Sequence, residues 1–317
     1  MSALFVSQKN YAYIKYECSI ILKGGREILY NSVAIIGGDK RQLFCAKAFC
    51  DDGVNVALGG FDKIKSDCEI KVLSPVEAGA KSELIVLPLP CVKGGYLNAP
   101  MSEENIAFDE TFLSAIKGKK IFCGQKDKLL EIAPSINKEL VYDYSQREEF
   151  AVLNAVSTAE GALEIAMREF EGTISHSKCL VCGFGRIGKV LTDMLIALNA
   201  DVTVSARSKK DLAYISTKQC KGVFTNDLHT LKPFDLIFNT VPALIFNSKV
   251  LSHIAKHAIV IDLASAPGGV DFLSASRMSI CAIHALSLPG KCAPKSAGEI
   301  IKNTITNMLE EDDRCQK

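Results

Sequence analysis

The residues best suited to chemistry form a glycine-rich turn in the second half of the chain. The pattern G-x-G-x-x-G is matched by Gly183, Phe184, Gly185, Arg186, Ile187 and Gly188. An apolar run precedes the turn, a helix is expected from about Lys189 to Leu198, and a second apolar run, 201–205, completes a β-α-β unit. In such a unit the glycines allow a tight turn, close approach of a pyrophosphate and packing of helix on strand. Because the helix N-terminus also offers free N–H groups, the turn predicts a dinucleotide site.

The end of the second strand in this unit bears on the choice of cofactor. NAD sites place Asp or Glu there to bind the ribose 2′-hydroxyl, whereas this chain has Ala206, Arg207 and Ser208, followed by two lysines. Arg207 can bond to a 2′-phosphate, and a charge-assisted contact of that kind is worth about 1.5–3 kcal/mol. The sequence therefore predicts NADP in preference to NAD. The alternative is that the basic run is only a solvated helix start.

Further polar or proline-rich segments follow predicted strands in the same half of the chain. The residues at two of these strand ends are Asn239, Thr240, Val241 and Pro242, and Asp262, Leu263 and Ala264. Since ligands of open α/β sheets bind at the carboxyl ends of strands, both groups are expected to line the cofactor site. A loop at 288–296 is expected to bring Lys291, Lys295 and Ser296 to the same cleft. For each segment the alternative is plain turn structure.

A second glycine turn lies in the N-terminal half, at the end of its first predicted strand. It carries Asp39 and Arg41 but lacks the full fingerprint, so no second dinucleotide is expected there. Arg41 is suited either to holding a substrate carboxylate in a two-point contact or to capping the local turn, and both interpretations stay open. His284 is the one histidine kept as a weak candidate for a catalytic base, and no metal site is predicted.

The elements that position these residues are apolar, β-branched runs that alternate with helical stretches, a pattern typical of parallel sheets covered on both faces. We expect an α/β protein with two doubly wound parallel-sheet domains, the second a Rossmann dinucleotide-binding domain. The expected parts are a substrate and catalytic domain at 1–147 with an extension at 1–32, a linking helix at 148–172, the dinucleotide domain at 173–294 and a C-terminal segment at 295–317. The helix of that last segment is expected to return to the first domain and to end in a frayed tail from Asp312.

The composition narrows the class of protein. The chain has 317 residues, of which 48% are hydrophobic and 23% charged, as in ordinary globular proteins. Lys and Arg number 37 against 36 Asp and Glu, so no large field favours nucleic acid or anionic lipid. The 12 cysteines are scattered, and neither a secretory signal nor an uncharged apolar span is evident. A cytoplasmic protein with reduced thiols is expected, without nucleic-acid or membrane partners.

Taken together, these segments resemble the family of dipicolinate synthase A subunits of endospore-forming bacteria, in one collinear order from 33 to about 309. The motifs that carry the resemblance are 35–39 with Arg41 and Gln42, 59–62, 183–186, 206–208, 239–242, 262–272, 288–290 and 293–298. The family is understood to form dipicolinate from dihydrodipicolinate with a nicotinamide cofactor and a flavoprotein-like partner, the B subunit of dipicolinate synthase. The resemblance implies a small dicarboxylate substrate, for which Asp39, Arg41, Lys295 and Ser296 are the candidate ligands, and a role in sporulation.

The sequence departs from the family pattern in three ways, the first being that residues 1–32 extend beyond the usual start of the family. Ala266 stands where an Arg is expected, and Ser157 stands where a Pro is expected. The two-domain plan also resembles the D-2-hydroxyacid dehydrogenases, although their Arg, acid and His trio has no clear counterpart here. The alternatives are therefore another NAD(P)-dependent dehydrogenase of the 2-hydroxyacid or amino-acid type, or a nucleotide-binding subunit without catalytic activity. Each of them is compatible with a homo-oligomer.

Overall fold

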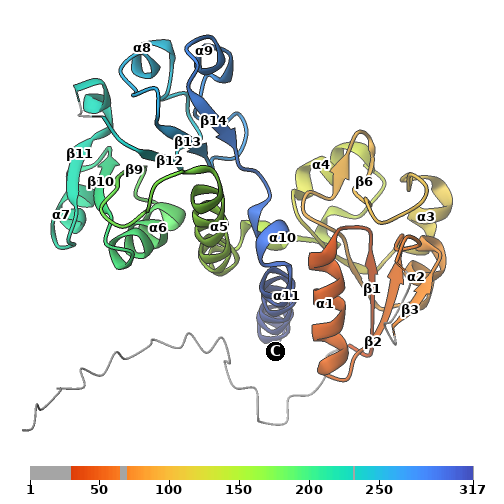
Figure 1. The fold of residues 1–317 in the computed structure, drawn as a ribbon. Coiled ribbons are helices and arrows are strands. Elements are labelled where there is room, and N and C mark those ends of the chain that lie inside the picture. The colour runs from red at the N-terminus through yellow and green to blue at the C-terminus, as the bar shows by residue number, and fades with distance from the viewer. Residues whose placement is uncertain (1–29, 65–69, 231–232, 317) are drawn as a thin grey trace, which may run out of the picture.

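Two parallel six-stranded sheets organise the chain (Figure 1). The computed structural model describes residues 30–64, 70–230 and 233–316, so nearly all of the predicted extension at 1–32 lies outside the described residues. The strand orders are β3-β2-β1-β4-β7-β8 and β11-β10-β9-β12-β13-β14, and every pairing in both sheets is parallel. In each sheet, the first three strands are added toward one edge and the next three toward the other edge, starting beside the first strand, as in doubly wound folds. The predicted fold class is confirmed.

The N-terminal domain is built on the first sheet. Its strands are β1 (Ser32–Ile36), β2 (Asn55–Gly59), β3 (Lys71–Leu73), β4 (Leu84–Val86), β7 (Lys120–Cys123) and β8 (Val141–Asp143). Its helices are α1 (Lys40–Asp51), α2 (Pro75–Lys81), α3 (Glu110–Ala115) and α4 (Lys126–Ile132), and a small hairpin joins β5 (Val92–Lys93) to β6 (Tyr96–Leu97). Short 3₁₀ turns are η1 (Lys138–Leu140) and η2 (Tyr144–Gln146). The central strands are apolar throughout because helices cover both of their faces.

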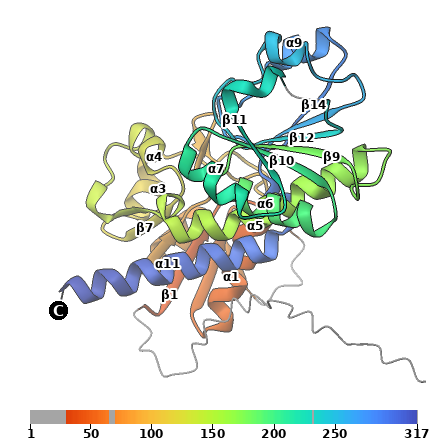
Figure 2. The same ribbon diagram turned by 90° about the vertical axis from the view of Figure 1, so that its left-hand side faces the viewer.

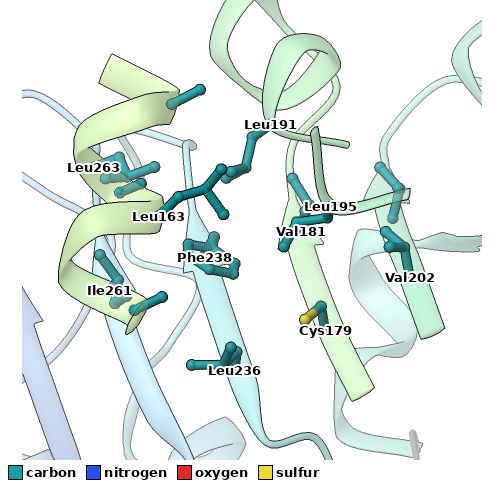
Figure 3. Close-up of a cluster of buried hydrophobic side chains, with 14 of the residues drawn as sticks. Leu163, Cys179, Val181, Leu191, Leu195, Val202, Leu236, Phe238, Ile261 and Leu263 are labelled. Carbon is teal, nitrogen blue, oxygen red and sulfur yellow. The ribbon is translucent and has the colours of Figure 1, made fainter. Parts of the chain in front are cut away.

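The C-terminal domain repeats this plan on the second sheet. Its strands are β9 (Lys178–Cys182), β10 (Asp201–Ala206), β11 (Lys221–Phe224), β12 (Leu236–Asn239), β13 (Ile259–Asp262) and β14 (Cys281–His284). Its helices are α6 (Arg186–Ala197), α7 (Lys209–Ser216), α8 (Ser248–Leu251) and α9 (Phe272–Arg277), with the 3₁₀ turn η3 (Thr225–Thr230). Figure 3 shows one core of this domain, where Leu163 packs between Phe238 of the sheet and Leu191 of α6.

Two long helices join the domains (Figure 2). Helix α5 (Glu148–Glu169) packs Phe150 in the core of the N-terminal domain and Leu163 in that of the C-terminal domain. Helix α11 (Pro294–Gln316) lies along α1 and adds Ile301 and Ile305 to the N-terminal core. Among the described helices, α5 alone is long and apolar enough to cross a membrane, by length and composition only.

The C-terminus differs from the sequence-based expectation at two places. The segment 288–296 is not a loop but α10 (Leu288–Cys292) followed directly by α11, because Pro289 and Pro294 occupy first-turn positions, where proline begins a helix. The predicted frayed tail is also wrong. Helix α11 continues to Gln316, and Asp312 accepts hydrogen bonds from Lys120 Nζ and Tyr142 Oη, each at 2.8 Å.

Candidate functional site

The glycine-rich turn connects β9 to α6 and has a distinct geometric requirement at each glycine. Gly183 has a φ of 96°, which side chains rarely adopt. A Cβ at Gly188 would lie 2.1 Å from the Gly183 carbonyl oxygen, so only glycine lets α6 approach the turn. At Gly185, by contrast, a Cβ would meet no heavy atom within 4 Å. The space beside Gly185 is therefore open to a ligand and not filled by the protein.

The N-terminus of α6 is open in the same way. Helix α6 begins at Arg186, three residues earlier than predicted. Its N-cap residue is Gly185, which has no side chain to accept hydrogen bonds from the first turn. Helix α1, at the equivalent place in the first sheet, is closed by Asp39, whose side chain accepts from Arg41 N in a capping box completed by Gln42. Of these two helices, only α6 leaves its first N–H groups for an anion. The turn fits the pyrophosphate of a dinucleotide.

A buried polar network fixes the strand ends beside the turn. Asn239 and Asp262 are both fully buried, and Asn239 Nδ2 donates to Asp262 Oδ1 at 2.8 Å and to the Val241 carbonyl at 3.0 Å. Asp262 Oδ2 in turn accepts from Gly269 N at 2.9 Å. Thr240 Oγ1 donates to the Cys182 carbonyl at 2.8 Å. The network holds the segments after β12 and β13 in place, while Pro242 is exposed beyond it.

The other residues predicted after β12 and β13 lie on the same edge of the sheet. Leu263 and Ala264 are buried directly after β13, and the Ala264 N–H donates to Asp262 Oδ1 at 3.2 Å. Ala266, where the family pattern has an Arg, is exposed in the following segment. A cation expected from the family pattern is thus replaced by a small apolar side chain on the surface.

The end of β10 is followed by an exposed arginine and a helix cap. Ala206 is buried, whereas Arg207 is exposed and forms no ion pair or hydrogen bond within the part of the chain that the structure describes. Ser208 is the N-cap of α7, and its Oγ accepts from Asp211 N at 3.0 Å and donates to Asp211 Oδ2 at 2.7 Å. The cap was not predicted, although the spacing of Ser208 and Asp211 signals it. Arg207 is thus an exposed cation at the end of β10 with no partner among the described residues.

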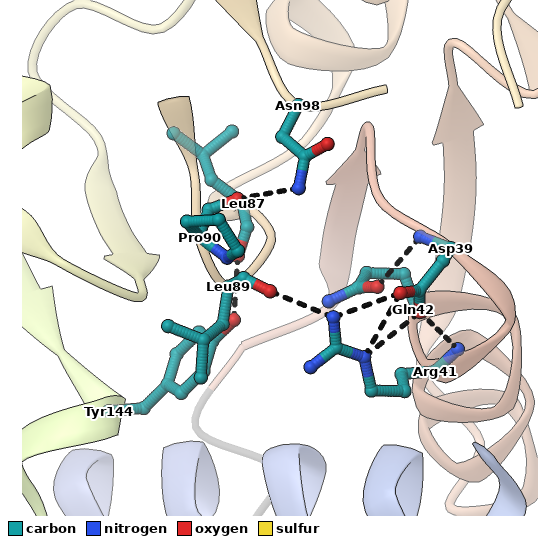
Figure 4. A network of polar contacts seen from close by, with 8 residues as sticks. All are labelled: Asp39, Arg41, Gln42, Leu87, Leu89, Pro90, Asn98 and Tyr144. Carbon is teal, nitrogen blue, oxygen red and sulfur yellow. Dashed lines mark hydrogen bonds and ion pairs between the residues drawn. The ribbon is translucent and has the colours of Figure 1, made fainter. Parts of the chain in front are cut away.

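Arg41 lies at the carboxyl edge of the N-terminal sheet and forms an internal network (Figure 4). Its Nε and Nη2 each donate at 2.9 Å to the Asp39 carboxylate, and Nη2 also donates to the Leu89 carbonyl at 2.8 Å. The residue is 9% exposed. These contacts match the interpretation in which Arg41 caps the local turn. Nη1 makes no hydrogen bond to a described residue, and it is not among the buried side-chain atoms that lack a partner. It is therefore accessible as a donor to a further anion.

The predicted lysine and serine ligands lie on helices and not in a loop. Lys295 has a side chain 72% exposed, with Nζ 4.0 Å from Glu299 Oε1, and Lys291 and Ser296 are exposed as well. Within the described ranges, no hydrogen bond or ion pair joins them to Arg41. The backbones are nevertheless close, because a Cβ at Gly298 would lie 2.4 Å from the Arg41 carbonyl oxygen. The structure therefore brings the starts of α1 and α11 together but leaves the ammonium groups in solvent.

Helix α10 completes this junction. A Cβ at Gly290 would lie 3.0 Å from Arg41 Nε and 3.3 Å from Asp39 Oδ2, so α10 rests against the ion pair. On its other side α10 packs on α5, where a Cβ at Gly161 would lie 3.0 Å from Leu288 Cβ. Arg41 is thus at the place where α1, α10 and α11 pack together. Nothing in the local sequence signals these contacts, because they join segments far apart in the chain.

The candidate base, His284, ends β14 and is exposed beside Asp262 in the strand register. Its ring lies 5.2 Å from the Phe272 ring, centroid to centroid. Across the residues that the structure describes, no group of three or more His, Cys, Asp or Glu could hold a metal ion.

Comparison with known proteins identifies the family. Residues 32–141 match the family described as the N-terminal domain of the dipicolinate synthase A subunit. The dipicolinate synthase A subunit of Bacillus subtilis (strain 168) is 33% identical over 285 residues, which cover 88% of this chain and 96% of that protein. The crystal structure of the dipicolinate synthase A subunit from Bacillus halodurans is similar with a TM-score of 0.78 and 29% identity, covering 88% of this chain and 97% of that one.

A more distant structure agrees in fold. The transhydrogenase from Sinorhizobium meliloti is similar with a TM-score of 0.63 over 88% of this chain and 93% of that one, at 12% identity, which shows the fold alone. The resemblance inferred from the motifs is confirmed by the identity to the Bacillus subtilis protein. The chain therefore belongs to the family of dipicolinate synthase A subunits.

Proposed function

We propose that this chain is the A subunit of a dipicolinate synthase and oxidises dihydrodipicolinate to dipicolinate with NADP, in the cytoplasm of the mother cell during sporulation. The observation that carries the proposal is the 33% identity to the Bacillus subtilis dipicolinate synthase protein over nearly the whole of its length. The open space beside Gly185 supports a cofactor site at this turn.

The proposed reaction converts dihydrodipicolinate and NADP⁺ into dipicolinate, NADPH and a proton. The nicotinamide, when bound, supplies the acceptor for a hydride that leaves a ring carbon. The tasks of the protein are to position the ring and to pair its charges, because aromatisation favours the product. Asn239 and Asp262 would keep the segments that follow β12 and β13 rigid. His284 is the candidate for taking up the proton.

NADP preference is proposed from the free guanidinium of Arg207, and a substitution tests it. Arg207→Ala should weaken NADPH binding by about tenfold and leave NADH binding nearly unchanged, because only NADPH carries the 2′-phosphate. Calorimetric titration with both cofactors measures the ratio of the NADPH and NADH dissociation constants. Equal affinity of the unsubstituted protein for NADPH and NADH would remove the basis for the preference.

The dicarboxylate is proposed to be held where α1 and α11 begin, by the free Nη1 of Arg41 together with Lys295 and Ser296. Lys295→Ala should lower kcat/KM for dihydrodipicolinate by tens-fold, or about 2 kcal/mol. NADPH affinity and the unfolding midpoint should not change, because the side chain is mostly solvent-exposed. Steady-state kinetics gives kcat/KM, cofactor titration gives the NADPH affinity, and thermal unfolding gives the midpoint.

Lys81→Ala is the matched control for this prediction. Lys81 forms the same kind of exposed pair, with Glu77 at 3.7 Å and i,i+4 spacing, but it ends α2 just before β4, away from the carboxyl edge of the sheet. Its kinetics should equal those of the unsubstituted protein. If Lys295→Ala behaves like Lys81→Ala, the carboxylates are held by other groups.

The activity itself is tested by measuring dipicolinate and NADPH formation from dihydrodipicolinate with this chain alone and together with a flavoprotein-like B subunit. We expect formation of both products, with the B subunit required for full activity. Turnover of 2-hydroxyacids or amino acids in place of dihydrodipicolinate would favour the other dehydrogenase classes. Cofactor binding without turnover in any mixture would favour a non-catalytic nucleotide-binding subunit.

A further inference from the structure

Arg186, the first residue of α6, directs its side chain to the helix that links the domains. Its Nε donates to Glu148 Oε1 at 2.9 Å, and its Nη2 lies 2.7 Å from Glu148 Oε2. Glu148 is the first residue of α5, at the end where Phe150 packs in the N-terminal core. A two-point ion pair therefore connects the glycine-rich turn to the N-terminal end of α5.

This ion pair lies beside the place that a pyrophosphate needs. Arg186 occupies the first position of α6, a helix whose N-terminus has no side-chain cap, and phosphate groups bind at such ends. The Arg186 guanidinium lowers the pKa of Glu148, so that carboxylate carries its negative charge at neutral pH. A cofactor pyrophosphate and the Glu148 carboxylate would then face the same guanidinium with the same sign of charge.

We propose that Glu148 competes with the cofactor pyrophosphate for Arg186, so that dinucleotide binding releases the turn from the N-terminal end of α5. The side chains of Arg186 and Glu148 are 54% and 67% exposed, and ion pairs of that kind are weak. Bonds from Arg to phosphate are stronger, so the exchange favours the cofactor. The inference requires a dinucleotide but not a particular one, and it is independent of the proposed substrate and of the preference for NADP.

Titration of the full chain with NADPH and with NADH tests the competition. Glu148→Gln should tighten both cofactors by the same factor, about fivefold, because both carry the same pyrophosphate. Glu164→Gln is the matched control: it removes the same charge from the same helix and breaks the exposed pair with Arg168, but it lies near the other end of α5. The control should change neither affinity.

Two further measurements separate competition from a merely structural effect. In an Arg186→Ala background, Glu148→Gln should have no effect on either affinity. Hydrogen exchange at the first turn of α5 should rise when cofactor is added to the unsubstituted protein, and should already be raised in Glu148→Gln without cofactor. Thermal unfolding verifies that each variant is folded, as expected for exposed side chains.

The opposite results would overturn the inference. Unchanged or weaker cofactor binding by Glu148→Gln would mean that Glu148 does not compete but is neutral or orients Arg186. A factor that differs between NADPH and NADH would place the effect at the 2′-phosphate and not at the pyrophosphate. Equal binding of NADPH and NADH by the unsubstituted protein would contradict only the proposed cofactor preference, because a common factor for Glu148→Gln would still support the competition.

Discussion

Gly185→Ala should leave the stability of the chain unchanged and weaken both NADPH and NADH binding by about a hundredfold, or about 2.7 kcal/mol. The backbone at Gly185 has a φ of −81° and a ψ of −159°, which alanine adopts without strain. A Cβ there meets no protein atom within 4 Å, so the methyl group costs the folded protein little. The same methyl group would occupy the space through which a pyrophosphate reaches the N–H groups of α6.

Gly188→Ala is the counterpart, which should lower stability as well as cofactor binding. Its Cβ would lie 2.1 Å from the Gly183 carbonyl oxygen, a backbone atom that cannot move without shifting the turn. We expect a lower unfolding midpoint and, as a consequence of the displaced turn, weaker binding as well. Thermal unfolding and fluorescence titration with the reduced cofactors distinguish the two variants. Normal cofactor affinity in folded Gly185→Ala would show that the pyrophosphate does not approach this residue.

The parts of the site that could be predicted from the sequence are those built from neighbouring residues. The turn at 183–188 is recognisable because strand, glycines and helix follow one another directly, and the two sheets are recognisable because buried parallel strands are continuous apolar runs. The prediction of a loop at 288–296 is wrong because proline marks both the start and the interruption of a helix. Pro289 lies in the first turn of α10, and Pro294 is the first residue of α11.

The contacts that could not be predicted join distant segments. Arg41 and Leu89 are 48 residues apart, and Arg186 and Glu148 are 38 residues apart. No local spacing relates the members of either pair, because their approach depends on how the sheets and α5 pack. For this reason the sequence leaves Arg41 with two interpretations, and only its partners in the fold indicate that it has a structural role whether or not it also binds substrate.

Arg41→Ala should lower the free energy of unfolding by about 3 kcal/mol, the low end of the range for breaking a buried ion pair. The substitution removes the partner of the Asp39 carboxylate and the donor to the Leu89 carbonyl, in a place where the arginine side chain is 10% exposed. The low end applies because the Asp39 side chain is 33% exposed and water can partly solvate it. Urea unfolding, followed by a probe in the N-terminal domain, measures the change.

Arg41→Lys separates the structural role of Arg41 from its proposed role toward substrate. A lysine keeps the positive charge but cannot reproduce two parallel bonds to Asp39 together with a third to Leu89, so part of the stability should be lost. If Nη1 also holds a substrate carboxylate, both variants should raise KM for dihydrodipicolinate at temperatures where they remain folded, with NADPH affinity unchanged. A loss of stability with normal KM would assign Arg41 a structural role alone. Full stability in Arg41→Ala would contradict the capping role, because an Arg41–Asp39 ion pair that can be broken without cost does not hold α1, α10 and the Leu89 segment together.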